Sequence, residues 1–368
     1  MPHALRLLLL AIVGIVIVAG ARNGTSNGYP DMRRGVNLET WLRPSSEPPP
    51  TAFELRTLKR IGFTFARVPV APDPSMTVRG DLRPEARVAL QSAVRSLLAA
   101  GLDVVVDLHP VEDAGNRAYG VSASYRARYS RLVVTTAAAL RQFPLTRVAL
   151  ELRNEPHPSD PDLITHPWRW PEWQLELVRA VRSVSQTLTL VVTADHWSSP
   201  EELRTLPTIP DRHVVYTFHD YEPFAFTHQG ATWTSPTYAW LRSVPYPPTP
   251  EGMAAARQQS EDVAGDLPRR AAVDLILDEY ALANWNRDRV NQQMAGVGTW
   301  AKRHHARVLL GEFGVYRRYA PRADAMRLLG DIRSASEQNN IGWAVWFWRS
   351  WAPAGAKPSG DLRAALFG

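Results

Sequence analysis

Short apolar segments alternate with longer amphipathic ones from about residue 33 onward, and this alternation limits the folds the chain can adopt. The predicted strands are residues 34–38, 63–70, 102–108, 148–152, 188–193, 213–218, 307–310 and 342–347. Nearly continuous apolar strands separated by helices are typical of a parallel sheet that is covered on both faces. Eight such units favour a closed (β/α)8 TIM barrel over an open sheet.

The intervals between the predicted strands carry the helical pattern. Predicted helices are residues 51–61, 83–100, 122–143, 170–186 and 323–337. The interval between strands six and seven is much longer, residues 221–306, and contains further helical segments at 251–264 and 269–283. We interpret it as an elaborated insertion and expect a single domain over residues 33–368.

The N-terminal segment predicts export. Residues 7–21 are an unbroken run of apolar residues and glycine after Arg6, and Ala19-Gly20-Ala21 resembles a cleavage site. The run fits a secretory signal better than a membrane span of about 20 residues. We expect residues 1–21 to be a signal peptide or an anchor, with 5–21 as a membrane tether, and 22–32 to be a flexible leader. The protein would then be periplasmic, secreted or tethered to the outer face of the inner membrane.

Charge and cysteine content narrow the function classes. The chain has 42 Lys and Arg against 36 Asp and Glu, and the basic residues are scattered singly or in pairs. Scattered charge without a basic stripe disfavours nucleic-acid binding. The chain has no cysteine, which excludes disulfides, thiolate metal sites and cysteine nucleophiles. We expect a monomer.

Polar or aromatic residues stand at every predicted strand end, where a barrel of this type carries its active site. Singly, each has a structural explanation: Arg67 as a buried ion-pair partner, His109 as a core residue, or Glu312 in a solvent-facing turn. Together at one rim they predict a functional site. In strand order they are Asn37 and Trp41, Arg67, His109, Asn154 and Glu155, Asp195, His196 and Trp197, His219 and Tyr221, Glu312, and Trp346.

Two of these residues, Glu155 and Glu312, can supply the carboxyl pair that glycoside hydrolysis needs. Alone, Asn154-Glu155-Pro156 is also compatible with an ordinary turn after a strand. The ends of strands four and seven face each other across a barrel mouth, in a range compatible with the separation of about 5–5.5 Å of retaining enzymes. Glu155 then needs a raised pKa to act as the acid, and Glu312 must stay anionic.

The remaining residues have predicted supporting roles. Arg67 and the Tyr221 hydroxyl can stabilise the Glu312 anion, and Asn154 can donate to a sugar 2-hydroxyl. The two histidines, His109 and His219, can bind sugar hydroxyls or orient the glutamates. Flat apolar faces for stacking on sugar rings are offered by Trp41, Trp197, Trp233 and Trp346.

Seven segments together resemble glycoside hydrolase family 5, the cellulase-type family of the large (β/α)8 glycosidase superfamily. They are RGVNLETWL (34–42), GFTFARVPV (62–70), GLDVVVDLH (101–109), LELRNEP (150–156), VVYTFHDY (214–221), LGEFG (310–314) and GWAVWFW (342–348). The family's functional set maps in order onto Arg67, His109, Asn154, Glu155, His219, Tyr221, Glu312 and Trp346.

This resemblance implies a retaining mechanism with Glu155 as acid/base and Glu312 as nucleophile, and no metal or other cofactor. Residues 221–233 resemble a motif of some bacterial endoglucanase-like members, which favours a β-glucan substrate and an endo-β-1,4-glucanase. Cleavage of β-1,3-glucan, mannan or xyloglucan, and glucan transglycosylation, remain alternatives. A non-catalytic carbohydrate-binding protein is the competing class, and the presence of both carboxyl residues argues against it.

Overall fold

A computed structural model describes residues 28–45, 47–110, 118–158, 168–346 and 359–368. Its eight strands form a closed parallel barrel in the order β1 to β8, with β8 pairing to β1. This confirms the predicted (β/α)8 fold. The strands are β1 (Arg34–Asn37), β2 (Phe65–Val70), β3 (Asp103–Leu108), β4 (Val148–Glu151), β5 (Thr189–Thr193), β6 (Val214–His219), β7 (Val308–Phe313) and β8 (Gly342–Val345).

Helices surround the barrel, and their ends follow the caps in the sequence. The first helix, for example, begins after Thr51, whose side chain and that of Glu54 form a reciprocal capping box, and ends at Gly62 with φ 122°. The longer barrel helices are α1 (Ala52–Ile61), α3 (Pro84–Ala99), α5 (Ala123–Leu140), α6 (Trp170–Arg182), α11 (Arg287–His304), α12 (Arg322–Gln338) and α14 (Gly360–Phe367). Short helices α2 (Pro72–Ser75) and α7 (Pro200–Leu203) follow β2 and β5.

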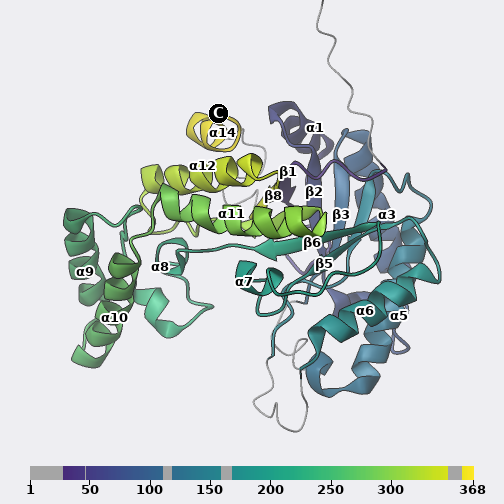
Figure 1. Ribbon diagram of the computed structural model, residues 1–368, viewed down its shortest axis with the longest axis horizontal. Helices are drawn as coiled ribbons and strands as arrows, with labels where there is room; N and C mark the ends of the chain where they lie inside the picture. The colour runs from purple at the N-terminus through teal and green to yellow at the C-terminus, as the bar shows by residue number, and fades with distance from the viewer. Residues whose placement is uncertain (1–27, 46, 111–117, 159–167, 347–358) are drawn as a thin grey trace, which may run out of the picture.

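The predicted insertion between strands six and seven is a helical projection. It contains α8 (Phe224–Thr227), the 3-10 helix η1 (Pro236–Trp240), α9 (Pro250–Ala264) and α10 (Leu267–Ala283). In Figure 1, α9 and α10 stand to the left, away from the strands, on the side opposite α5 and α6. The insertion therefore extends the rim of the barrel without entering its sheet.

The barrel interior changes from apolar to polar along the strands. One layer is apolar and consists of Phe65, Val105, Ala149, Val191, Val215, Leu309 and Ala344. Side chains alternate between the two faces of a strand, so the next inward position lies two residues further on. Those positions are largely polar: Asn37, Arg67, Asp107, Glu151, Thr193 and Thr217, all buried. The sequence thus builds a polar floor above an apolar base.

Strand seven extends further than predicted. The sequence pattern ends it at residue 310, but β7 continues to Phe313. A register shift between Phe218 and His219 of β6 places His219 opposite Glu312, leaving Gly311 as the extra residue. A β-bulge of this kind re-aims the following side chain. Glu312 therefore lies within a strand and points into the barrel, not in the turn after it.

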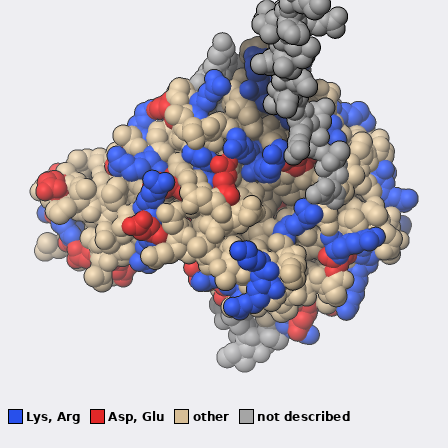
Figure 2. Space-filling model, turned by 45° about the horizontal axis from the view of Figure 1, so that its top comes forward, with Lys and Arg blue, Asp and Glu red and all other residues tan. Residues whose placement is uncertain are grey.

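Surface charge is mixed, as the composition indicates. Figure 2 shows basic and acidic side chains interspersed over the visible face. Among the described residues, none of the helices is both long and apolar enough to cross a membrane. The predicted signal or tether at residues 1–21 lies outside the described part of the chain.

Candidate active site

Arg67 is the centre of the polar floor at the carboxyl end of the barrel. Its guanidinium is fully buried and contacts groups from four other strands or strand ends. Its partners are Glu151 (2.7 and 2.8 Å), Asn154 Oδ1 (2.7 Å), Glu312 Oε1 (2.7 Å), Asn37 Oδ1 (3.0 Å) and Asp107 Oδ2 (3.0 Å). Its planar set of N–H donors suits such a multiple contact, which a lysine could not make.

One positive charge here faces three buried carboxyl groups, those of Asp107, Glu151 and Glu312. Burial raises the pKa of Asp107 to about 6, although Arg67 opposes the shift. Burial likewise raises the pKa of Glu151, again against the effect of Arg67. The site therefore favours states in which the carboxyl groups are not all ionised.

A hydrogen-bonded chain fixes the state of His109. The Asn154 Oδ1 atom accepts from Arg67, so its Nδ2 atom is the one that faces His109 Nε2 at 3.3 Å. An amide nitrogen only donates, so Nε2 must accept, and Nδ1 must then donate to Asp107 at 2.7 Å. Burial lowers the pKa of His109 well below its usual value, which keeps the ring neutral. Trp346, directly after β8 and not within it as predicted, stacks on this ring at 5.7 Å.

Both carboxyl oxygens of Glu312 accept hydrogen bonds. Oε1 accepts from Arg67 at 2.7 Å and Oε2 accepts from the Tyr221 hydroxyl at 2.8 Å. Burial raises the pKa of Tyr221 well above its usual value, so the hydroxyl keeps its proton and donates. Two donors, one of them charged, therefore fix the position of the Glu312 carboxyl group.

Glu155 has a different environment at the end of β4. Burial raises its pKa to about 7 despite the nearby charge of Arg67. Its side chain is 27% exposed, so it still reaches the cleft. Oε1 lies 2.7 Å from His219 Nδ1, and burial lowers the pKa of His219 to about 4. A neutral histidine beside a carboxyl of raised pKa leaves Glu155 able to hold a proton near neutral pH.

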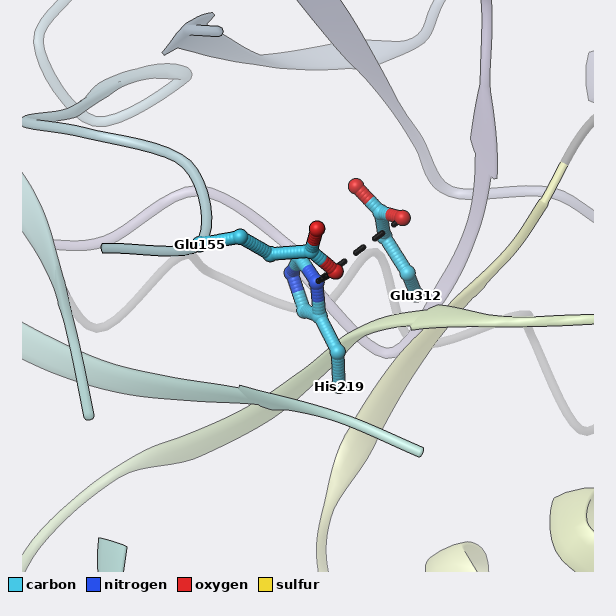
Figure 3. Close-up of side chains that lie close together, drawn as sticks. All are labelled: Glu155, His219 and Glu312. Atoms are coloured by element: carbon cyan, nitrogen blue, oxygen red, sulfur yellow. Dashed lines mark hydrogen bonds and ion pairs between the residues drawn. The ribbon is translucent and has the colours of Figure 1, made fainter. Parts of the chain in front are cut away.

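The two glutamates face each other. Figure 3 shows Glu155, Glu312 and His219 converging from three directions, with both carboxyl groups pointing into the same space. One ligand atom from each of the three lies within 4.8 Å of the others. This agrees with the short separation expected of a retaining pair, about 5–5.5 Å. The same three atoms could hold a metal ion, but Arg67 already supplies the positive charge at Glu312.

The predicted aromatic residues occupy different sectors of the rim. Trp197, after β5, is 54% exposed and stacks on the His157 ring at 4.4 Å with an angle of 15°. Trp233, in the insertion, is 62% exposed and contacts Tyr316 edge-on at 4.7 Å. Trp41, after β1, is partly buried against the core.

Several residues of the site were missed by the sequence analysis. Asp107 and Glu151 complete the contacts of Arg67, and their signal was a charged residue inside an otherwise apolar strand, which requires a buried partner. Glu39 follows β1, and burial raises its pKa to about 7, with the nearby charge of Glu312 adding to the shift.

Comparisons with known proteins point to one family. The family model "Cellulase (glycosyl hydrolase family 5)" matches residues 25–351. Endoglucanase C of Acetivibrio thermocellus is 24% identical over 330 residues, covering 85% of this chain and 90% of that protein. Endoglucanase 3 of Fibrobacter succinogenes is 24% identical over 331 residues, covering 86% of this chain and 49% of that protein.

Solved structures share the fold. Thermotoga maritima Cel5A in complex with mannotriose superposes with a TM-score of 0.72 at 20% identity, covering 93% of this chain and 99% of that one. The cellulose synthase subunit Z (CcsZ) of Clostridioides difficile superposes with a TM-score of 0.71 at 20% identity, covering 92% and 100%. With the family model spanning most of the chain, this protein is a glycoside hydrolase that belongs to glycosyl hydrolase family 5.

Proposed function

We propose that this chain is an endo-β-1,4-glucanase that works by double displacement, with Glu155 as acid/base and Glu312 as nucleophile. The observation that carries the proposal is the contrast between the two facing carboxyl groups. Glu312 accepts hydrogen bonds from Arg67 and Tyr221, the contacts that a nucleophilic carboxylate needs. Glu155 has a pKa of about 7 and can carry a proton. Nucleophile and acid need those opposite states.

In the first step, the Glu155 carboxyl donates its proton to the glycosidic oxygen while a Glu312 oxygen attacks the anomeric carbon. The bond to the leaving sugar breaks and an ester bond to Glu312 forms. In the second step, the Glu155 carboxylate takes a proton from water, whose oxygen attacks the same carbon. The ester bond breaks, and both residues return to their starting states.

Asn154 is suited to bind the sugar 2-hydroxyl beside the reacting carbon. Its Oδ1 is occupied by Arg67, and one Nδ2 hydrogen faces His109. Within the described part of the chain, the other Nδ2 hydrogen has no hydrogen-bond partner, and it can donate to the substrate. Trp346, stacked on His109, is the aromatic residue that we place beside the same sugar ring.

The substrate proposal follows the family and its relatives. Proteins named endoglucanase align with most of this chain, and the family model is named for cellulase. β-1,3-Glucan, mannan, xyloglucan and transglycosylation are the alternatives to test. A panel of these polysaccharides with product sizing checks the proposal. Internal cleavage should give short and intermediate β-1,4-gluco-oligosaccharides. Release of products only from one of the other glycans would contradict the proposed β-1,4-glucanase activity.

Catalysis itself is tested by Glu312→Ala. This variant should release no reducing ends while still binding glucan, because the nucleophile is lost and the cleft is kept. Glu251→Ala, an exposed glutamate at the start of α9, is the matched control and should keep full activity. Unchanged turnover in Glu312→Ala would refute the nucleophile assignment.

We further propose that the protein is exported and acts as a monomer, either released or tethered through residues 5–21. The support for export is the apolar run at residues 7–21, which ends in the small residues Ala19-Gly20-Ala21. N-terminal sequencing of the exported protein tests it. A start near Arg22 means cleavage, an intact Met1 in the membrane fraction means a tether, and retention in the cytoplasm would contradict export.

A further inference from the structure

The end of the barrel opposite the active site is basic. Helices run antiparallel to the strands in this fold, so the last turn of each barrel helix lies at the amino ends of the strands. The helices α1, α6 and α11 all have basic residues in that turn, and other basic residues lie in the loops that lead into strands. The exposed cations at this end, which we call the amino face, are Lys59, Arg60, Arg141, Arg179, Arg212, Lys302, Arg303 and Arg307.

The acidic side chains at the amino face do not balance these cations, because each already forms an ion pair with another arginine. The pairs are Asp31–Arg33 at 2.6 Å, Asp103–Arg147 at 2.7 Å, Asp211–Arg182 at 2.5 Å and Glu337–Arg34 at 2.8 Å. Within the described part of the chain, none of the exposed cations named above forms an ion pair. Basic residues that are scattered along the sequence are thus brought together as an excess of positive charge at one end of the barrel.

Helix stability explains only part of this arrangement. A cation in the last turn of a helix interacts favourably with the helix dipole, which gives a structural reason for Lys59 and Lys302. Arg212 and Arg307 lie in loops, directly before β6 and β7, and have no such reason. Nor does the dipole explain why the described acidic side chains of this face are all paired. An anionic partner of the amino face explains both observations.

The chain that precedes β1 crosses the same face. The Tyr29 hydroxyl donates to the Arg212 carbonyl, and the Arg307 guanidinium lies 3.8 Å from the centre of the Tyr29 ring. The apolar run ends at residue 21, seven residues before residue 28, which is a span of at most about 25 Å in a fully extended chain. The apolar run is therefore joined to the molecule at its most basic end.

We propose that the amino face docks on an anionic phospholipid surface. The inference rests on the proposed export, because export brings the chain to a membrane. Clustered Lys and Arg side chains are attracted to anionic headgroups, and an apolar segment beside them adds a second membrane contact if it is retained. Glu155 and Glu312 lie at the opposite end of the barrel, so the docked protein would hold its cleft away from the membrane and open to a long glucan.

Two lysines of the amino face, Lys59 and Lys302, report on the docking. The purified full chain is mixed with vesicles of phosphatidylcholine, alone or with an equal part of phosphatidylglycerol, and acetylation of each lysine is followed by mass spectrometry. Acetylation of both lysines should slow at least about threefold on the anionic vesicles relative to the zwitterionic ones. The difference should disappear at about 1 M salt, where the Debye length is about 3 Å. Equal rates on the two kinds of vesicle would overturn the docking.

A double charge reversal locates the contact. Arg212→Glu with Arg303→Glu acts on the amino face and keeps both reporter lysines. The control, Arg79→Glu with Arg87→Glu, makes the same change of charge at exposed positions before and in the first turn of α3, at the other end of the barrel. The first variant should lose the protection by anionic vesicles and the control should keep it, while both retain wild-type glucan turnover.

Two results would overturn the proposal at this stage. One is equal protection in the two variants, and the other is protection by a soluble acidic polysaccharide such as polygalacturonate but not by anionic vesicles. The labelling requires neither export nor catalysis, so failure of the proposed function would leave its result unchanged and can be distinguished from failure of the docking.

Discussion

At the scale of single residues, one guanidinium sets the electrostatics of the site. Arg67 contacts the Glu312 carboxyl group and also Asp107 and Glu151, while Glu155 lies outside its hydrogen bonds. Burial raises the pKa of Glu155 to about 7. The opposite roles that we propose for the two glutamates rest on this difference in surroundings.

The acid role of Glu155 predicts a substrate-dependent defect. Glu155→Gln should lower kcat on glucan by about 10²- to 10⁴-fold, because proton donation to a poor leaving group is lost. Glycosylation by an aryl glycoside with a good leaving group should be affected far less. In the wild type, glucan turnover should fall as pH rises through about 7, where Glu155 loses its proton. The kcat/KM values for both substrates across pH, which report the glycosylation step, provide the measurement.

Two results would contradict this assignment. One is an equal loss on both substrates, and the other is a wild-type profile that stays flat on glucan well above pH 7. Glu39→Gln is the useful comparison, because the pKa of Glu39 is also raised by burial to about 7. Glu39→Gln should discriminate between good and poor leaving groups as the wild type does.

Residue types at strand ends could be predicted from the sequence because a barrel gathers them at one rim. The contacts between them could not. The strand registers pair Asp107 with Glu151 and pair Arg67 with Val105, two residues before Asp107, and the long Arg67 side chain reaches both carboxyl groups from there. Register is a property of the closed sheet, and no local pattern in the chain specifies it.

At the scale of elements, the bulge in β7 positions the proposed nucleophile. The extra residue, Gly311, has its carbonyl bonded to Asn37 Nδ2 at 3.0 Å. A Cβ atom there would lie 2.6 Å from Thr217 Oγ1 and 3.0 Å from His219 Nε2. Glycine is therefore required by the close approach of β6. The apolar pattern alone ends this strand at residue 310 because glycine normally interrupts a strand pattern, whereas β7 continues to Phe313.

Gly311→Ala should damage both stability and activity. The added methyl group must displace strand atoms, which costs about 1–3 kcal/mol of unfolding free energy and moves Glu312 and His219. Denaturant unfolding and glucan turnover measure the two effects.

Gly330→Ala is the control for this substitution. Gly330 lies inside α12, and a Cβ there meets nothing closer than 3.6 Å. Replacing glycine by alanine in a helix interior should stabilise the protein by about 0.5–1 kcal/mol. If Gly311→Ala were as stable and as active as the wild type, the bulge would not depend on glycine.

At the scale of the whole molecule, the fold was predictable and the arrangement of its insertion was not. Strands and barrel helices follow from the apolar periodicity and the caps. The helices α9 and α10 were expected near their observed limits. Their projection away from the barrel (Figure 1) depends on contacts among α8, η1 and α10, which a single sequence does not reveal.

Buried acids make the stability of the whole molecule depend on pH. Asp220, after β6, is 4% exposed, and burial raises its pKa to about 8 from 3.8. The folded state therefore binds this proton more tightly than the unfolded state. This stabilisation of the folded state is complete below the pKa of Asp220 in the unfolded state, and it is lost as pH rises through about 8.

Asp220→Asn should remove this dependence. The Tm of the variant minus that of the wild type should be larger at about pH 9 than at about pH 5. The variant has no carboxylate charge to keep buried at high pH. Melting temperatures at the two pH values measure the gain. Asp262→Asn, an exposed residue of α9, should change Tm equally at both. If the Tm difference between Asp220→Asn and the wild type were the same at both pH values, Asp220 would not be the source of the pH dependence.

The central claim is that Glu312 forms a covalent bond to the sugar while Glu155 does not. Incubation with a 2-deoxy-2-fluoro β-cellobioside that has a dinitrophenyl leaving group should trap the intermediate, because the fluorine slows its hydrolysis. Peptide mapping by mass spectrometry should then find one glycosyl group, on Glu312. A label on Glu155, or turnover with inversion and no labelled protein, would contradict the account.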